Sequence, residues 1–295
     1  MRADAELTAL ITGAGGQLGI ELQTAAPAGW RVVPCSSRDL DVTQPAAVDT
    51  ALERERPGVV FNAAAYTAVD AAEGEPERAE AVNARGAAHV ATAAQRVGAR
   101  LIHVSTDFVF DGTQGHPYAP GDRPNPLGVY GRTKLAGERE ALRLSGGGAL
   151  VVHTAWVYSA HGRNFVRTML RLMREREEVG VVSDQVGTPT WARSLAQALW
   201  VAAGRSELRG IHHWTAAGVA SWYDFAVAIQ DEALGLGLLD RAVPIRPLRT
   251  GEYPSRARRP PYSVLDTNAT RSALDLPATH WRVDLRMMLR GLADA

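Results

Sequence analysis

The chain contains 295 residues, and its 32 lysine and arginine residues balance its 32 aspartate and glutamate residues. A formal net charge of +0 provides no overall field that would draw nucleic acid or an anionic membrane surface, so we expect neither as a partner. The single cysteine, Cys35, excludes an internal disulfide and a cysteine-cluster metal site, and it fits a reducing compartment.

Short apolar runs alternate with stretches of helical period through the first half of the chain. The runs expected to be strands are 7–12, 30–35, 58–64, 100–105 and 149–154, and those expected to be helices are 18–26, 45–55, 76–98 and 129–144. This alternation is typical of a parallel sheet with crossover helices. Because the strand runs are apolar almost throughout, helices should cover both faces of the sheet. The sequence predicts an α/β fold with a doubly wound parallel sheet of the Rossmann type.

The second half is less regular. It predicts helices over 164–177, 192–204 and 221–233, with Ser221 as an N-cap, and a strand over 210–216. Residues 183–190 are rich in turn formers, and 244–261, with its five prolines, should form a structured loop or an extended arm without regular structure. We expect a dinucleotide-binding domain over 1–157, to which 179–215 return. A smaller substrate-binding lobe should comprise 158–178 and 216–295, with a cleft between the two.

No apolar run reaches the roughly 18 residues that a bilayer span needs, and the first residues carry acids where a signal peptide has a basic region. We therefore expect a cytoplasmic protein.

A glycine-rich turn follows the first expected strand. Gly13, Gly16 and Gly19 would permit a tight turn, a close approach to a pyrophosphate and close packing of the helix on the strand. The fingerprint G-x-G-x-x-G is not met, because Leu18 stands in its last place. A plain strand-to-helix turn is the alternative, although the position after the first strand favours a dinucleotide.

The end of the second expected strand indicates which dinucleotide binds. An acid there usually holds the ribose hydroxyls of NAD, but Ser37 and Arg38 come first in this chain and could hold a 2′-phosphate. We predict NADPH as the cofactor, with NADH as the alternative. Asp41 either approaches the adenine side or caps the following helix.

The only lysine of the chain, Lys134, lies four residues after Tyr130 in an expected helix, so both side chains project from one face. A free tyrosine has a pKa of about 10, and lowering it by about 3 units takes about 4 kcal/mol, which an ammonium and a positive nicotinamide could supply. Lys134 would also hydrogen-bond the nicotinamide ribose. Thr106, which follows Ser105 at the end of an expected strand, could hold a substrate carbonyl, or could simply form a turn.

Six segments together resemble the extended short-chain dehydrogenase/reductase superfamily and, within it, the dTDP-4-dehydrorhamnose reductases: 12–19, 62–70, 105–112, 130–138, 154–158 and 184–190. The resemblance covers nearly the whole chain. It implies that hydride from NADPH reduces the C4 ketone of dTDP-4-dehydro-L-rhamnose to give dTDP-L-rhamnose, with Tyr130 as proton donor, Lys134 beside it and Thr106 on the oxygen.

The resemblance also implies sets of binding residues. Cofactor contacts fall on Gly16, Gln17, Leu18, Asp41, Val42, Ala64, Ala65, Tyr66, Tyr130 and Lys134, and contacts to the dTDP-sugar fall on Thr106, Asp107, Trp156 and Arg259. A buried core position is the alternative for Trp156, and a solvated charge is the alternative for Arg259. His103 and His153 are expected in strands as packed core residues, and the pair at 212–213 is expected in a strand, because no carboxylate or cysteine accompanies it at ligand spacing.

Some features depart from the family. Glu21 matches a glutamate that binds magnesium at a dimer contact in some members, but Arg193 stands where its partner is expected, so we predict no metal and either a monomer or a homodimer. Phe108 lacks the acid that dehydratases of the superfamily carry, which favours a reductase. Two alternatives stay open. The protein could reduce another dTDP-4-keto-6-deoxysugar in secondary metabolism, or act as a non-catalytic NADP-binding regulatory subunit.

Overall fold

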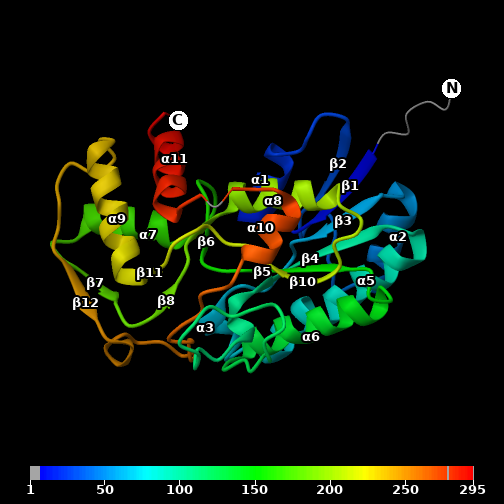
Figure 1. Ribbon diagram of the computed structural model, residues 1–295, viewed down its shortest axis with the longest axis horizontal. Helices are drawn as coiled ribbons and strands as arrows, with labels where there is room; N and C mark the ends of the chain where they lie inside the picture. The colour runs from blue at the N-terminus through cyan, green and yellow to red at the C-terminus, as the bar shows by residue number, and fades with distance from the viewer. Residues whose placement is uncertain (1–6, 278, 295) are drawn as a thin grey trace.

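A six-stranded parallel sheet forms the centre of the computed structural model, which describes residues 7–277 and 279–294 (Figure 1). Its strands are β1 (Leu7–Thr12), β2 (Trp30–Cys35), β3 (Val59–Asn62), β4 (Arg100–Thr106), β5 (Leu150–Thr154) and β10 (Gly210–His213). They lie in the order β10-β5-β4-β3-β1-β2. The predicted doubly wound fold is confirmed, and all six strands fall on predicted runs.

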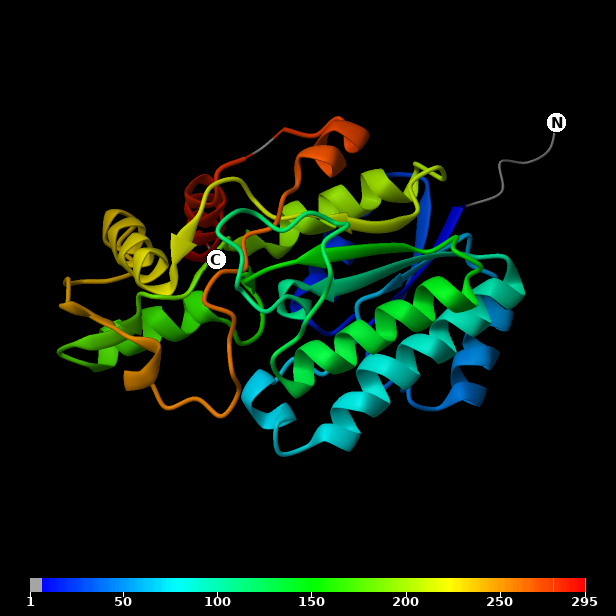
Figure 2. The same ribbon diagram turned by 60° about the horizontal axis from the view of Figure 1, so that its bottom comes forward.

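Helices cover both faces of this sheet, as the unbroken apolar runs predict. On one face lie α2 (Pro45–Glu55), α5 (Gly86–Val97) and α6 (Val129–Leu144), which Figure 2 shows side by side. On the other face, α1 (Gln17–Thr24) packs against α8 (Ala192–Ala203). Every residue of β3 and of β5 is buried, so the two layers of helices enclose the centre of the sheet.

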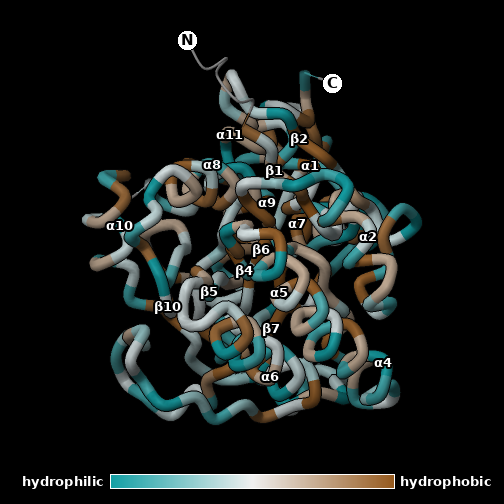
Figure 3. Tube along the Cα trace, turned by 90° about the vertical axis from the view of Figure 1, so that its right-hand side faces the viewer, coloured by the Kyte–Doolittle hydropathy of each residue, from teal (hydrophilic) through white to brown (hydrophobic). Residues whose placement is uncertain are grey.

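The helix predicted over 76–98 has a change of pitch. It consists of α4 (Pro76–Glu80), a π-helical turn over Ala81–Arg85, and α5. Such wide turns are rare and occur often at functional sites. In Figure 3, α4 lies at the outer edge of the molecule in the colour of hydrophilic residues, so the first turn of this helix faces solvent.

A second lobe lies at the left of Figure 1 around its own apolar core. Its helices are α7 (Phe165–Glu175), α9 (Trp222–Gly235) and α11 (Trp281–Ala293). Short strand pairs complete it: β6 (Val157–Tyr158) with β9 (Thr190–Trp191), β8 (Val186–Gly187) with β11 (Ala220–Ser221), and β7 (Val179–Val182) with β12 (Ile245–Leu248). Fully buried Phe225 contacts the rings of Tyr158, Phe165 and Trp281.

The expectation that 244–261 holds no regular structure is wrong. Residues 245–248 form β12, parallel to β7, and a short 3₁₀ turn follows over Thr250–Glu252. Pro247 is tolerated because β12 pairs on one side only, so the missing N–H removes no bond from the ladder. The backbone N–H of Ser183 donates to Leu248 O at 2.8 Å and holds the end of the pair.

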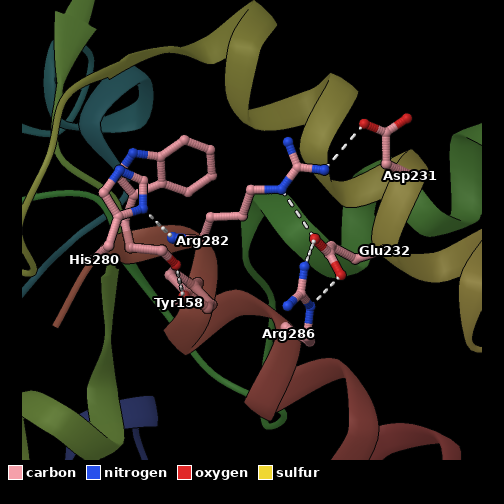
Figure 4. A network of polar contacts seen from close by, with 7 residues as sticks. Tyr158, Asp231, Glu232, His280, Arg282 and Arg286 are labelled. Carbon is pink, nitrogen blue, oxygen red and sulfur yellow. Dashed lines mark hydrogen bonds and ion pairs between the residues drawn. The ribbon is translucent and has the colours of Figure 1, made fainter.

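Charged side chains join α9 to α11 on the outside of the second lobe (Figure 4). Glu232 on α9 accepts bonds from Arg282 at 2.9 Å and from Arg286 at 2.7 Å, both on α11. At the start of α9, Ser221 accepts a bond from the Asp224 N–H at 3.0 Å, and the Asp224 carboxylate accepts one from the Ser221 N–H at 2.9 Å. The predicted N-cap is therefore confirmed as a reciprocal capping box.

Segments after residue 157 divide between the two cores. Helix α8 and α10 (Asn268–Leu274) pack on the central sheet, which β10 extends, whereas β7 packs in the second lobe. The predicted lobe boundaries stay a prediction. Within 7–277 and 279–294, no helix combines the length and apolar character required to cross a membrane.

Candidate active site

A cavity of about 830 Å³ opens at the carboxyl ends of the central strands and is lined by both lobes. Ligands bind at this edge in open parallel sheets. Its walls include the predicted cofactor residues Gly13, Gly16, Gln17, Leu18, Gly19, Ser37, Asp41, Val42, Ala64, Ala65 and Tyr66, together with Thr106, Asp107, Tyr130, Lys134, Trp156 and Arg259. The structure thus brings together every predicted site residue except Arg38.

The glycine-rich turn is as tight as its sequence predicts. Gly13 has φ +67°, and a Cβ atom there would lie 2.7 Å from Ala63 O. A Cβ at Gly19 would overlap the carbonyl oxygen of Gly13. Gly16 is the N-cap of α1, and its side chain-free backbone faces the cavity. This cradle, which larger residues would fill, fits the pyrophosphate of a dinucleotide on a helix N-terminus.

A buried chain of hydrogen bonds holds the neighbouring wall. Thr12 Oγ1 donates to Asn62 Oδ1 at 2.7 Å, and Asn62 Nδ2 lies 3.0 Å from His103 Nδ1. Thr12 Oγ1 also accepts a bond from the Ala64 N–H at 3.3 Å. These contacts place the backbone of 63–66 along the cavity, and they confirm that His103 is a packed strand residue.

The residues after β2 divide between cavity and surface. Ser37 lines the cavity, whereas Arg38 lies on the exposed turn 36–39 outside it. Asp41 both lines the cavity and accepts bonds from the backbone N–H of Thr43 at 2.9 Å and the Thr43 hydroxyl at 2.8 Å. Asp41 therefore orders the turn before α2 but does not cap this helix, whose N-cap is Gln44, so the capping alternative is wrong.

Tyr130 and Lys134 lie on successive turns of α6 and both face the cavity. Glu73 Oε1 accepts the Val129 N–H at 2.7 Å and so anchors the first turn of this helix. Lys134 is 2% exposed, and its Nζ donates to Val104 O at 2.7 Å. Burial lowers the pKa of Lys134 to about 8, which leaves the ammonium charged at neutral pH.

The protein groups by themselves do not lower the pKa of Tyr130, so the expectation that Lys134 would do so is wrong. Burial raises the pKa of Tyr130 to about 12, and hydrogen bonding with Thr106 offsets only part of this rise. The nearby carboxylates Asp107 and Glu138 raise it further. Desolvation of the phenol, which residue spacing does not reveal, exceeds the contributions that lower the pKa.

Thr106 and Asp107 end β4 beside Tyr130. Thr106 Oγ1 donates to Asp107 Oδ1 at 3.0 Å and accepts the Phe108 N–H at 3.2 Å, so it also caps a 3₁₀ turn over Asp107–Val109. Asp107 is 1% exposed, and burial raises its pKa to about 6. The Phe108 ring meets the Tyr130 ring edge to face, with centroids 5.6 Å apart. This packing limits the movement of the phenol.

Trp156 lies on the side of the cavity formed by the second lobe. Its ring stacks on that of Trp222 at 3.6 Å with 4° between the planes, and both rings line the cavity. Trp156 has φ +48°, a left-handed conformation that is uncommon for a bulky residue. A Cβ on Gly187 would lie 2.6 Å from the indole, so Gly187 leaves the space that the ring occupies. Trp156 is a cavity wall rather than a core residue.

Arg259 is not a freely solvated charge. Its Nη2 lies 2.6 Å from Asp70 Oδ2, on α3 (Val69–Ala72), and its Nη1 contacts Ser255 Oγ. Burial acts to raise the pKa of Asp70, but Arg259, the Ala257 N–H and the Ser255 hydroxyl outweigh burial and hold this pKa low, at about 2. This contact joins the first lobe to the loop that borders the cavity.

Three residues that hold or line the cavity were not predicted from the sequence. Asn83, a buried residue of the π-helical turn behind the cavity wall, accepts the Tyr66 N–H at 2.8 Å and donates to Thr133 on α6 at 3.1 Å. Trp222 and Asn164 line the cavity itself. Asn164 Nδ2 donates to Gln17 Oε1 at 2.9 Å and so joins the second lobe to the glycine-rich turn. An asparagine inside a long helical pattern was the available signal for Asn83, whereas Trp222 and Asn164 offered none.

The Glu21 carboxylate forms an ion pair with an arginine of the same chain, Arg193. Arg193 Nε lies 2.9 Å from Glu21 Oε2, and Ser159 donates to Glu21 Oε1 at 3.0 Å. The Glu21 carboxylate is 1% exposed. Over the described part of the chain, no group of three or more His, Cys, Asp or Glu side chains could hold a metal ion.

Comparison with known proteins identifies the family. The family model described as RmlD substrate binding domain matches residues 7–293. The chain is 42% identical over 293 residues to the dTDP-4-dehydrorhamnose reductase of Burkholderia thailandensis, covering 96% of this chain and 98% of that protein. This chain belongs to the dTDP-4-dehydrorhamnose reductase family. The predicted resemblance and the oxidoreductase class are confirmed.

This chain is also similar to a solved structure of the family and to a reductase of another dTDP-sugar. The Bacillus anthracis dTDP-4-dehydrorhamnose reductase in complex with NADP superposes with a TM-score of 0.91 at 36% identity, over 96% of this chain and 99% of that one. A dTDP-4-keto-6-deoxy-D-glucose reductase of Streptomyces niveus is 41% identical over 280 residues, covering 94% of each chain.

Proposed function

We propose that this protein reduces the C4 ketone of dTDP-4-dehydro-L-rhamnose with NADPH to give dTDP-L-rhamnose, and that Tyr130 donates the proton. One observation carries the proposal: Thr106, Tyr130 and Lys134 border the same cavity as the glycine-rich turn. A dinucleotide that lies on the turn thereby reaches the phenol. Family membership supports the reaction class.

NADPH supplies the hydride. Gly13, Gly16 and the N-terminus of α1 would hold its pyrophosphate, and the backbone of Ala64, Ala65 and Tyr66 would border it. Ser37, with Arg38 turning inward from its exposed position, would receive the 2′-phosphate. The NADP complex of the Bacillus anthracis relative supports NADPH, and NADH remains the alternative.

The phenol of Tyr130 acts as the acid. A pKa of about 12 keeps the Tyr130 phenol protonated at neutral pH, so its proton is available for transfer. Thr106, which interacts with the phenol, would hold the substrate oxygen where negative charge develops. The charged Lys134 lies one turn away and stabilises the phenolate that remains after proton transfer.

The substrate would occupy the part of the cavity shared with the second lobe. Asp107 and the Trp156 ring border the space beside Tyr130, and the guanidinium of Arg259 suits a diphosphate. We further propose a cytoplasmic monomer or homodimer. The Streptomyces niveus relative supports a second candidate, a reductase of another dTDP-4-keto-6-deoxysugar, which would keep the same catalytic residues. A regulatory subunit without turnover would have no need of them.

The test follows NADPH oxidation with the substrate generated in situ by the upstream dehydratase and epimerase. Oxidation that requires the epimerase supports the rhamnose pathway. Equal oxidation without the epimerase, when only dTDP-4-keto-6-deoxyglucose is present, supports the second candidate. NADPH binding with no oxidation under either condition contradicts both reductase proposals.

A further inference from the structure

A buried polar cluster lies beneath the catalytic helix and is not explained by substrate or cofactor contact. Its centre is Glu138, which is 1% exposed and lies four residues after Lys134 on α6. Residues at this spacing are neighbours on one helix face. Glu138 does not line the cavity, yet a buried carboxylate is costly unless other groups satisfy it.

Two side chains from neighbouring strands hold this carboxylate. Ser105 on β4 donates its hydroxyl proton to Glu138 Oε1, and His153 Nε2 on β5 lies 3.0 Å from Glu138 Oε2. On its other side, His153 Nδ1 lies 3.1 Å from His213 Nε2 on β10, and the two rings stack. Glu138 therefore has a defined place next to the lysine.

Lys134 needs such a neighbour. Its ammonium is nearly inaccessible to water and, among the residues that the structure describes, makes one hydrogen bond, to the neutral Val104 carbonyl. Burial lowers its pKa, and Glu138 is the group that raises it again. The other titratable groups near these two side chains are Tyr130 on α6, His103 and Asp107 at β4, His153 on β5 and His213 on β10.

None of these other groups replaces Glu138. The pKa of His103 lies well below its ordinary value through burial and through Lys134 itself, so this ring is neutral. Asp107 is bound to Thr106 beside the phenol. Tyr130 is protonated, because burial raises its pKa to about 12.

We propose that Glu138 is a positioning residue: its carboxylate, held by Ser105 and His153, keeps Lys134 charged and directed at the site of proton transfer. This inference rests on the proposed reductase function for its kinetic consequence but not for its direct test. The carboxylate acts through Lys134 and touches neither ligand.

The single lysine of the chain permits that direct test. Protein labelled with isotopic lysine gives one side-chain amine signal, which reports the titration of Lys134 alone. Glu138→Gln keeps the size of the side chain and an oxygen for Ser105 but removes the charge. We expect the pKa of Lys134 to fall by about 1 unit in this variant. The same titration midpoint in both proteins would overturn the proposal.

The kinetic test uses the same variant. The ammonium is present below the pKa of Lys134 and lost above it, so the alkaline limb of kcat should move about 1 unit toward lower pH, with about a fivefold loss at pH 8. Glu140→Gln, a half-buried neighbour on α6 paired with Arg143, is the matched control and should leave the limb in place. A loss of activity at all pH values without a shift would indicate a merely structural role and contradict the proposal.

Folding of the variant is checked by thermal denaturation. Should Glu138→Gln fail to fold, the double variant Glu138→Gln with His153→Gln replaces the buried pair by two amides that can hydrogen-bond each other. The lysine signal should shift in the same direction. Because the titration needs no turnover, a wild-type protein without reductase activity but with the expected shift would contradict the proposed function and support the role of Glu138.

Discussion

Lys134 is the one lysine among 32 basic residues, and its surroundings explain why an arginine does not stand there. The Lys134 side chain is 2% exposed, and its Nζ atom donates a hydrogen bond to Val104 O. A planar guanidinium is larger than an ammonium and cannot be satisfied by one carbonyl. The compact charge thus fits a position between the cavity and the buried carboxylate of Glu138.

We predict that Lys134→Arg loses at least about 100-fold in kcat/KM, because the guanidinium displaces its neighbours and leaves donors unpaired. The measurement is steady-state NADPH oxidation. Arg132→Lys, an exposed change two residues away on the same helix, is the control and should remain as active as the wild type. A fully active Lys134→Arg protein would show that any cation suffices.

Local motifs explain which site residues the sequence could predict. Tyr130 and Lys134 are neighbours on one helix, and Thr106 ends a strand, so spacing alone placed them at one edge. The partners of Arg259 could not be found in this way, because Asp70 lies 189 residues away. The high pKa of Tyr130 also escaped, since desolvation depends on packing that spacing does not reveal.

Helix α6, which carries Tyr130 and Lys134, packs closely against α5 and the π-helical turn before it. Gly137 has no room for a side chain, because a Cβ there would overlap Asn83 O and lie 3.2 Å from the Ala87 Cβ. We predict that Gly137→Ala lowers the free energy of unfolding by about 1–3 kcal/mol and reduces activity, as α6 must move. Thermal denaturation measures the effect.

The control for this prediction is a helical glycine with open space. Gly291 in α11 has no atom of residues 7–277 or 279–294 within 4 Å of an added Cβ, apart from its chain neighbours and its own helix backbone. Gly291→Ala should stabilise the protein by about 0.4–1 kcal/mol, since alanine lowers the entropy of the unfolded chain. Equal stability of the two variants would contradict the packing account of α5 and α6.

The contact between α9 and α11 should depend on pH. Arg286 and Arg282 hold the pKa of Glu232 at about 2, below its ordinary value, so the stabilisation is present above about pH 4.5 and is lost as the pH falls toward 2. With the arginines about half exposed, we predict that Glu232→Gln costs about 1–2 kcal/mol at pH 7. The difference between variant and wild type should shrink in urea unfolding at pH 3, and a constant difference would contradict this account.

Helices could be predicted where the spacing of apolar residues and a capping residue or proline at the helix start indicate the same bounds. The bounds of α2 and α6 match the predicted 45–55 and 129–144, and Ser221 caps α9. The sequence did not predict strand β12, because prolines usually interrupt regular structure. An edge strand such as β12 nevertheless tolerates a proline. The π-helical turn at 81–85 has no hydrophobic pattern of its own, and the partners of Asn83 in this turn, Tyr66 and Thr133, lie 17 and 50 residues away in the sequence.

The two lobes are connected across the cavity by Asp70. Its carboxylate accepts bonds from the N–H groups of Arg256 and Ala257 and binds Arg259. We predict that Asp70→Ala raises the KM for the nucleotide sugar about tenfold, equivalent to about 1.4 kcal/mol, while the Kd for NADPH stays within about twofold.

Kinetic titration of each ligand in turn checks this separation. Asp231→Ala removes a comparable surface pair with Arg282 on the far lobe and should change neither constant. A parallel loss of NADPH affinity in Asp70→Ala would mean that Asp70 supports the cofactor side of the cavity as well.

In the proposed reaction, Tyr130 gives the proton while the ketone is reduced in the cavity between the two lobes. The most direct measurement compares Tyr130→Phe with the wild type in NADPH oxidation and in NADPH binding. We predict that turnover falls by about 10²–10⁴-fold while the Kd for NADPH changes less than about threefold, because only the phenolic proton is removed. Turnover near the wild-type rate, or a loss of NADPH binding that accounts for the lost activity, would contradict the account.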